Sequence, residues 1–170
     1  MLIILVTIVL ILFLGWIFWQ DLSQRLVSLW LLITVVLCAL ITKFLHQSLW
    51  MGLCQTAINL TLLGWLLLLL TVYVSVRSHK LTWPVGKWIG AGDLLFWLTP
   101  AIVLPPPRFI LYWLASSVFA LIAHWILRLI VTRYYRRDTY GESIPLAGLQ
   151  ALWLGAILLS QMNGSSVYYQ

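Results

Sequence analysis

Charged residues are scarce in this sequence, and acidic residues are almost absent. Of its 170 residues, 8% are charged, 63% are hydrophobic and only four are Asp or Glu. The mean hydropathy is +1.02. A soluble domain of this length cannot bury so much apolar surface, so lipid must be the solvent for most of the chain. The composition therefore predicts an integral membrane protein.

The few charges are mostly positive, with a formal net charge of +6. Such a balance would also suit a protein that binds nucleic acid. The basic residues, however, lie in short gaps between apolar runs, which is the pattern of cytoplasmic membrane loops. We therefore expect the lipid bilayer, and no nucleic acid, to be the partner of this charge.

Cysteine and histidine are too few and too scattered for the common metal sites. Cys38 and Cys54 lie in separate apolar runs without a CxxC pair, and the three histidines, at 46, 79 and 124, are far apart in the sequence. This spacing supports neither a disulfide nor a zinc framework. We expect two packing or lipid-facing thiols, no metal and no other cofactor.

Long apolar runs fill most of the chain, and the first begins at the N-terminus. That run has no basic start and no small-residue cleavage site, so it predicts a retained span and not a signal peptide. A span needs about 20 apolar residues and tolerates roughly 17–25. We predict a single domain over residues 1–170, an all-α bundle of about six transmembrane helices. Their expected ranges are Leu2–Trp19, Val27–Thr42, Trp50–Val76, Asp93–Leu104, Phe109–Val131 and Ile144–Met162.

The fourth of these ranges is too short for an ordinary span. It is followed directly by Pro105, Pro106 and Pro107. Prolines remove backbone donors and fix φ, so this stretch predicts an irregular helix end or a turn.

The basic residues also predict an orientation for the bundle. If the N-terminus lies outside, seven Lys and Arg residues fall in inner gaps and two in outer gaps, which is a clear positive-inside bias. The inner set is Arg25, Arg77, Lys80, Lys87, Arg133, Arg136 and Arg137, and the outer set is Lys43 and Arg108. Both termini are then expected outside.

Two of the four acidic residues fall at one predicted membrane face. The first span runs inward and ends at Asp21, whereas the fourth starts from the inner side at Asp93. The two carboxylates can meet if those helices pack. Taken singly, Asp93 could be a helix cap and Asp21 a solvated loop residue. Two of so few acids at one membrane depth favour a functional pair.

A carboxyl pair in a dry site has a defined chemistry. Both groups cannot ionise comfortably, so the pair holds one proton and can act as base and acid together. One carboxylate takes a proton from water that attacks a peptide carbonyl, and the other carboxyl polarises the carbonyl and protonates the leaving amine. Gly90 and Gly92 flank this site and have no side chains. We expect them to let the backbone bend and an extended peptide approach Asp93.

At these residues the chain resembles a known family. Gly90–Asp93, which reads Gly-Ala-Gly-Asp, matches the GxGD signature of membrane aspartyl peptidases, and the remainder resembles the prepilin peptidase, or type IV leader peptidase, branch. Asp21 lies where that branch has its first aspartate, followed by a basic and then an apolar segment. The stretch Ile144–Leu152 resembles the branch's Ile-Pro opening of the last helix.

The resemblance implies a multi-pass peptidase of a prokaryotic inner membrane, in type IV pilus or type II secretion systems. Such an enzyme would cleave the basic leader from prepilin-like substrates at the cytoplasmic face. Asp21 and Asp93 would be its catalytic pair, with Gly90 and Gly92 giving the substrate access. The CxxC pairs and zinc-type cytoplasmic domain of the long bifunctional members are absent, so no methyltransferase activity is expected.

Two departures from the family pattern lie beside the proposed site. Val27–Leu29 stand where the family usually has Ile-Pro-Asn, and Leu95 stands where it usually has Lys. These departures keep a second hypothesis open: a diverged, non-catalytic relative that binds pilin-like helices or assembly proteins. A third hypothesis, a proton-coupled carrier, has less support because the chain lacks inverted repeats and further intramembrane acids.

The topology can be tested by labelling single cysteines in a background in which Cys38 and Cys54 are replaced by serine. Because of the positive-inside bias, a cysteine at Ser78 should react only after a reagent enters the cell, and one at Ser48 should react from outside. If the Ser78 position reacts only from outside, Asp21 and Asp93 do not share the cytoplasmic face.

Overall fold

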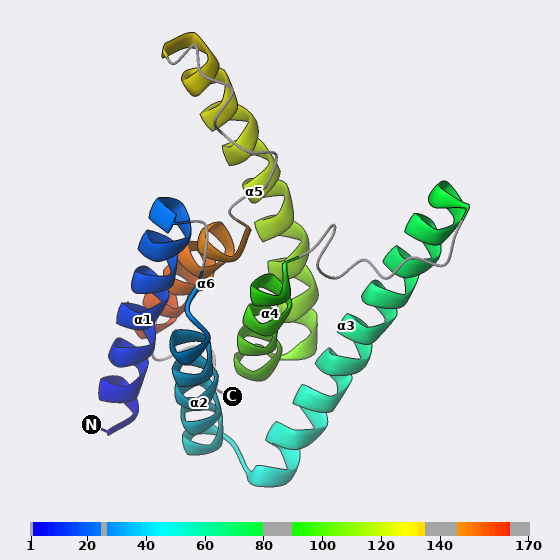
Figure 1. Cartoon of the computed structure of the whole chain (residues 1–170). Helices are drawn as coiled ribbons and strands as arrows, with labels where there is room; N and C mark the ends of the chain where they lie inside the picture. The colour runs from blue at the N-terminus through cyan, green and yellow to red at the C-terminus, as the bar shows by residue number, and fades with distance from the viewer. Residues whose placement is uncertain (1, 25–26, 80–89, 135–145, 164–170) are drawn as a thin grey trace.

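The structure, a computed structural model, describes residues 2–24, 27–79, 90–134 and 146–163. These residues form six helices and no strand, which confirms the predicted all-α fold (Figure 1). The helices are α1 (Leu2–Gln24), α2 (Leu29–His46), α3 (Leu49–Ser78), α4 (Ala91–Val103), α5 (Pro106–Tyr134) and α6 (Leu146–Asn163).

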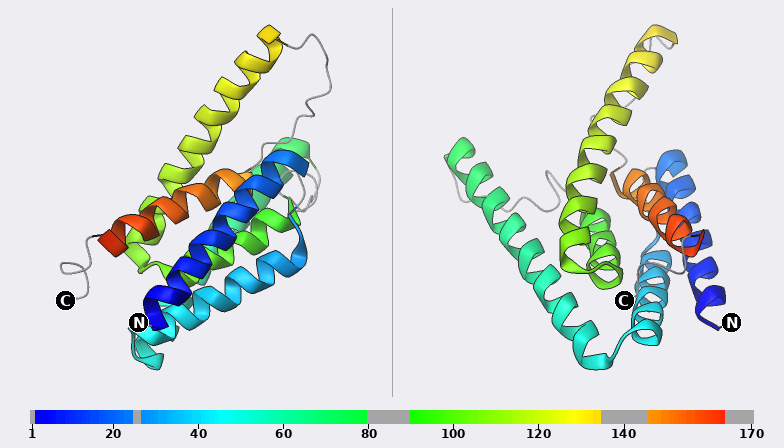
Figure 2. Two further views of the ribbon diagram at one scale, coloured as in Figure 1. Left: turned by 90° about the vertical axis from the view of Figure 1, so that its left-hand side faces the viewer. Right: turned by 180° about the vertical axis from the view of Figure 1, so that it is seen from behind.

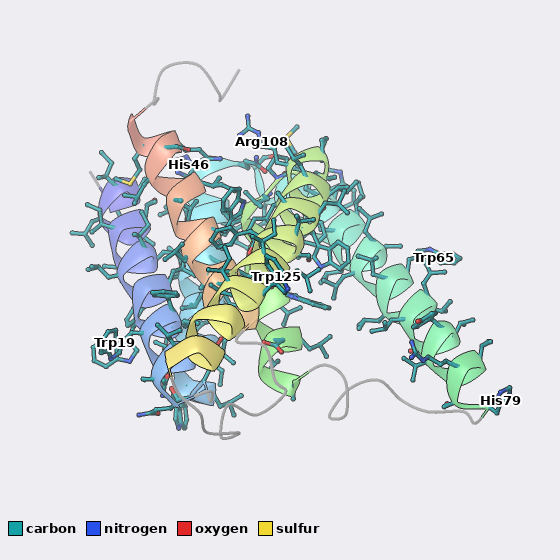
Figure 3. All side chains as sticks on the ribbon, turned by 90° about the horizontal axis from the view of Figure 1, so that it is seen from above. Trp19, His46, Trp65, His79, Arg108 and Trp125 are labelled. Atoms are coloured by element: carbon teal, nitrogen blue, oxygen red, sulfur yellow. The ribbon has the colours of Figure 1, made fainter. Side chains whose placement is uncertain are left out.

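Four of these helices are long and apolar enough to cross a membrane. They are α1, α2, α3 and the Pro106–Ala123 part of α5, whereas α4 and α6 are shorter apolar helices. The outward faces carry large apolar side chains as a bilayer requires. Trp19 and Trp65, for example, are 69% and 60% exposed and point away from the bundle (Figure 3).

The helices alternate in direction, so the molecule has two distinct ends (Figure 1). α1 ends and α4 and α6 begin at the first, which we call the Asp end because it holds Asp21 and Asp93. α1 begins and α2 and α4 end at the second, which we call the Lys end because it holds Lys43. Toward the Asp end α3 diverges from the other helices, as Figure 1 and the right view of Figure 2 show.

The core lies between α1, α2, α4 and α6, and α1 packs most extensively on α6. The buried stripe of α1 recurs at every third or fourth position, as expected for one face of a helix. Its members are Thr7, Leu10, Leu14, Ile17 and Asp21. The same periodicity that buries the apolar residues therefore also buries the acid, and Asp21 is only 6% exposed.

Leu104 and Pro105 form a tight turn between α4 and α5, as predicted for the proline stretch, and Pro106 and Pro107 begin α5. α4 ends at Val103, and Pro105 O accepts the first backbone bond of α5 from Phe109 N at 2.9 Å. Pro105 has no N–H, so the carbonyl of Ala101 loses its usual partner four residues on. Asn59 of α3 replaces that donor.

The Asn59 amide donates to both Ala101 O and Leu104 O, each at 2.8 Å, and Asn59 is fully buried. In a low-dielectric core, an unpaired carbonyl is costly, so this side chain satisfies a backbone defect that the prolines create. Asn59 thereby links α3 to the end of α4.

Lys43 does not lie in an outer loop as predicted. The predicted span ended at Thr42, but α2 continues by one turn to His46. Lys43 is therefore on the helix, 4% exposed, and its ammonium group donates to Gln55 Oε1 of α3 at 2.6 Å. The apolar run that defined the predicted span ends before Lys43. The helix continues past this residue because Gln55 of α3 provides a hydrogen-bond acceptor for the lysine.

We predict that Asn59→Leu lowers the free energy of unfolding by about 1–3 kcal/mol, because two buried carbonyls lose their donor. Thr61→Ala is the control on the same helix, since the Thr61 side chain is exposed and bonds only within α3. The measurement is thermal or chemical unfolding in detergent. Equal stability of the two variants would mean that Asn59 does not support the turn.

Candidate active site

The first amides of α6 bind both predicted site acids. Ala147 N donates to Asp93 Oδ1 at 3.0 Å, and Gly148 N donates to Asp21 Oδ2 at 2.6 Å. The first four N–H groups of any helix lack an acceptor within the helix. Here two carboxylates from other helices, bonded to consecutive residues, supply acceptors.

The structure therefore brings Asp21 and Asp93 to one place, but not by the route expected from the sequence. α1 and α4 do not pack on each other in the described residues, and the two Asp Cα atoms lie more than 8 Å apart. Both helices pack on α6 instead. The sequence suggests that the acids can meet if α1 and α4 pack on each other; in the structure the start of α6 joins them instead.

Opposing electrostatic effects act on the two acids: the start of α6 favours their negative charge, whereas burial and the proximity of the other acid oppose it at Asp93. A helix N-terminus carries a partial positive charge of roughly half an elementary charge, which stabilises nearby carboxylates. Asp93 also receives the backbone N–H of Gly90. Asp21 is buried, whereas Asp93 is only partly buried. Asp93 is thus the more accessible member of the pair.

Asp93 is not the N-cap of its own helix. α4 begins at Ala91, and its N-cap is Gly90, which places Asp93 within the first helical turn. Asp93 nevertheless caps α4 from this N3 position, because it accepts the backbone N–H of the N-cap residue Gly90, as in a capping box. The helix-cap role is therefore present in the structure together with the bond to α6. Its partners are the α6 start and the Gly90 amide.

The two glycines of the signature have different surroundings. A Cβ atom on Gly90 would lie 3.1 Å from Asp93 Oδ2, whereas a Cβ on Gly92 would meet nothing within 4 Å. Gly90 is therefore the one beside the carboxylate, and Gly92 borders open space. Their role in substrate access stays a prediction.

A third glycine, Gly148, has the tightest contact with the pair. A Cβ there would lie 2.9 Å from both Cβ and Oδ2 of Asp21, closer than real Cβ contacts. Only glycine lets the α6 backbone approach Asp21 closely enough for the bond from Gly148 N. Sequence reasoning singled out Gly90 and Gly92 for the site and missed Gly148. The available signal was its position three residues after Pro145, in the stretch that resembles the family's last helix.

A buried polar group lies about one turn deeper than the acids. Trp97 Nε1 donates to Gln150 Oε1 at 2.8 Å, and the Tyr112 hydroxyl donates to Gln150 O at 2.9 Å. Trp97 is one turn after Asp93 on α4, and Gln150 is three residues after Ala147 on α6. These bonds hold α4 and α5 against α6, so they help to position Asp93.

Other polar candidates add no second centre in the described part of the chain. No group of three His, Cys, Asp or Glu side chains there could hold a metal ion, and Cys38 and Cys54 are free thiols. Asp138 and Glu142, the remaining acids, lie outside the described residues.

No family model, no curated protein and no solved structure matches this chain. The functional argument therefore rests on the residues and their geometry.

We predict that Gly148→Ala lowers the free energy of unfolding by about 1–3 kcal/mol, the usual range for forced overpacking. Gly155→Ala is the matched control on α6, since a Cβ there meets nothing within 4 Å and alanine favours the helix. Unfolding in detergent measures both. An unchanged Gly148→Ala protein would show that Asp21 does not lie against the start of α6.

Proposed function

We propose that this protein is a membrane aspartyl endopeptidase that uses Asp21 and Asp93 as its catalytic pair. One observation carries the proposal: two of only four acids in the chain converge on consecutive amides of α6 at one end of an apolar bundle. Acids are costly near the hydrocarbon and tend to mark function there. The resemblance of Gly90–Asp93 to the GxGD signature supplies the reaction class.

The mechanism follows from two carboxyl groups that share one proton. The unprotonated carboxylate removes a proton from water as its oxygen attacks the peptide carbonyl carbon. The protonated partner donates a hydrogen bond to the carbonyl oxygen and stabilises the tetrahedral intermediate. When the C–N bond breaks, a proton passes to the leaving amine, and the pair returns to its starting state. No step in this sequence needs a cofactor.

The proposed substrates are prepilin-like proteins, with a short basic leader and a hydrophobic helix that stays in the membrane. Two features support a substrate of this shape. Asp93 is partly buried beside open space at Gly92, so a peptide has an approach to it. α3 also diverges from α4 and α5 toward the Asp end, so it does not pack along the full length of these helices (Figure 1). The proposed location is a prokaryotic inner membrane, with the Asp end in the cytoplasm.

A non-catalytic role has support of its own. Both carboxylates already serve as acceptors for α6, which is a structural function that needs no chemistry. Leu95 and Val27–Leu29 also replace residues that the family usually keeps beside its site. On this second hypothesis the Asp end binds a pilin-like helix or an assembly protein without cutting it.

The decisive experiment is co-expression with candidate prepilins, followed by intact-mass analysis of the substrate. We expect the wild-type chain to remove the leader, and Asp21→Asn and Asp93→Asn each to abolish the mass loss. Asparagine keeps the size and can still cap a helix, but it cannot hold or pass the shared proton. The double variant should be no worse than either single variant, because the two acids act as a unit.

Asp138→Asn is the matched control, since it makes the same chemical change at an acid outside the pair, and it should cleave normally. Normal cleavage by Asp21→Asn or Asp93→Asn would refute the catalytic pair. Co-purification of an uncut prepilin with wild-type protein and both variants would favour the binding hypothesis.

A further inference from the structure

A cavity at the Lys end lies far from the acid pair and has no role in the proposed peptidase. Its volume is about 180 Å³, below the roughly 300–1,000 Å³ of pockets for drug-sized ligands. The walls come from the start of α1 and the ends of α2, α4 and α6. This size suits a small polar group rather than a peptide.

The polar wall of the cavity includes a buried lysine, whose ammonium nitrogen also reaches Gln55 of α3. Lys43, 4% exposed, lines the cavity with Thr42, His46 and Gln161. The one bond recorded for the Lys43 ammonium is to a neutral amide oxygen, that of Gln55. An ammonium group has three donors, and burial of a charge is costly without a counter-charge.

The described residues offer no such counter-charge. Their acidic side chains are Asp21 and Asp93, and both lie at the opposite end of the bundle. In the described structure the two signs of buried charge are thus separated by the length of the bundle. The cavity beside Lys43 is therefore suited to an anion brought by a ligand.

The remaining walls are apolar and lead to the lipid-facing surface. Ile3, Ile4 and Met162 line the cavity, and Ile4 is 56% exposed on the outward side of α1. A soluble anion would gain nothing from these side chains, whereas the acyl chains of a lipid would continue along them. Basic pockets between membrane helices are a known means of binding anionic headgroups.

We propose that this cavity binds the phosphodiester headgroup of an anionic phospholipid, with Lys43 as the main contact to the phosphate. His46 and Gln161 are further polar groups of the wall beside the headgroup, and Ile3 and Ile4 contact the start of the acyl chain. The Thr42 hydroxyl donates to Cys38 O within α2, so it contributes no donor to the phosphate. The cavity contains neither acid of the pair, so an experiment on lipid binding tests this proposal separately from the peptidase proposal.

Native mass spectrometry of the full chain in detergent tests this, with phosphatidylglycerol and phosphatidylcholine as the two probes. We expect one phosphatidylglycerol to bind in preference to phosphatidylcholine. Lys43→Gln should weaken that binding by roughly tenfold or more, because the ammonium is the charge that selects the anion. Arg108→Gln is the matched control, since it removes a positive charge at the same end without touching the cavity, and it should change the affinity little.

Three outcomes would overturn the proposal. Equal binding of the two lipids would show that no anion is selected, and equal loss in Lys43→Gln and Arg108→Gln would show only general surface attraction. Displacement of the lipid by an equal concentration of free glycerol phosphate would identify a soluble anion as the ligand. If Lys43→Gln fails to fold, Ile4→Trp offers a second test, because it fills the cavity and keeps the charge. That variant should also lose the bound lipid.

Discussion

The start of α6 is the point on which the architecture of the Asp end depends. A helix that begins inside an apolar bundle leaves several N–H groups without partners, and lipid cannot supply acceptors. Asp21 and Asp93 supply them from two helices that do not pack on each other. The same contact satisfies the backbone, places both acids beside a partial positive charge, and joins α1 and α4 through α6.

At the Lys end, too, a backbone group without a partner in its own helix needs a hydrogen bond from elsewhere. Pro105 removes a donor at the end of α4, and the amide of Asn59 replaces it from α3. In both places a backbone group without a partner in its own helix bonds to a side chain from another. Among the buried polar residues that the structure describes, Asp21, Lys43, Asn59 and Gln150 bond to another helix, whereas Thr7, Thr42 and Ser116 bond to the backbone of their own.

A structural and a catalytic role for the acids do not exclude one another. Hydrogen bonds from α6 hold each carboxylate in place, and a preorganised acid pair costs less to align with a substrate. The asymmetry of burial is consistent with this arrangement, since Asp21 lies on the core stripe of α1 and Asp93 faces more open surroundings. Gly148 then matters as much as the glycines of the signature, because it sets how closely the α6 backbone approaches Asp21.

Much of this protein follows from its sequence alone. The apolar runs determined six helices and their membrane character, because run length and backbone satisfaction leave few other solutions in lipid. The order of the runs also put Asp21 and Asp93 at one end. Tertiary structure decided what the acids bind, since their partners are 127 and 54 residues away in the chain. It also decided that Lys43 is buried, because Gln55 of α3 accepts a hydrogen bond from its ammonium group inside the bundle. Periodicity reports which face of a helix is apolar, but only packing determines which backbone group of another helix comes to lie against it.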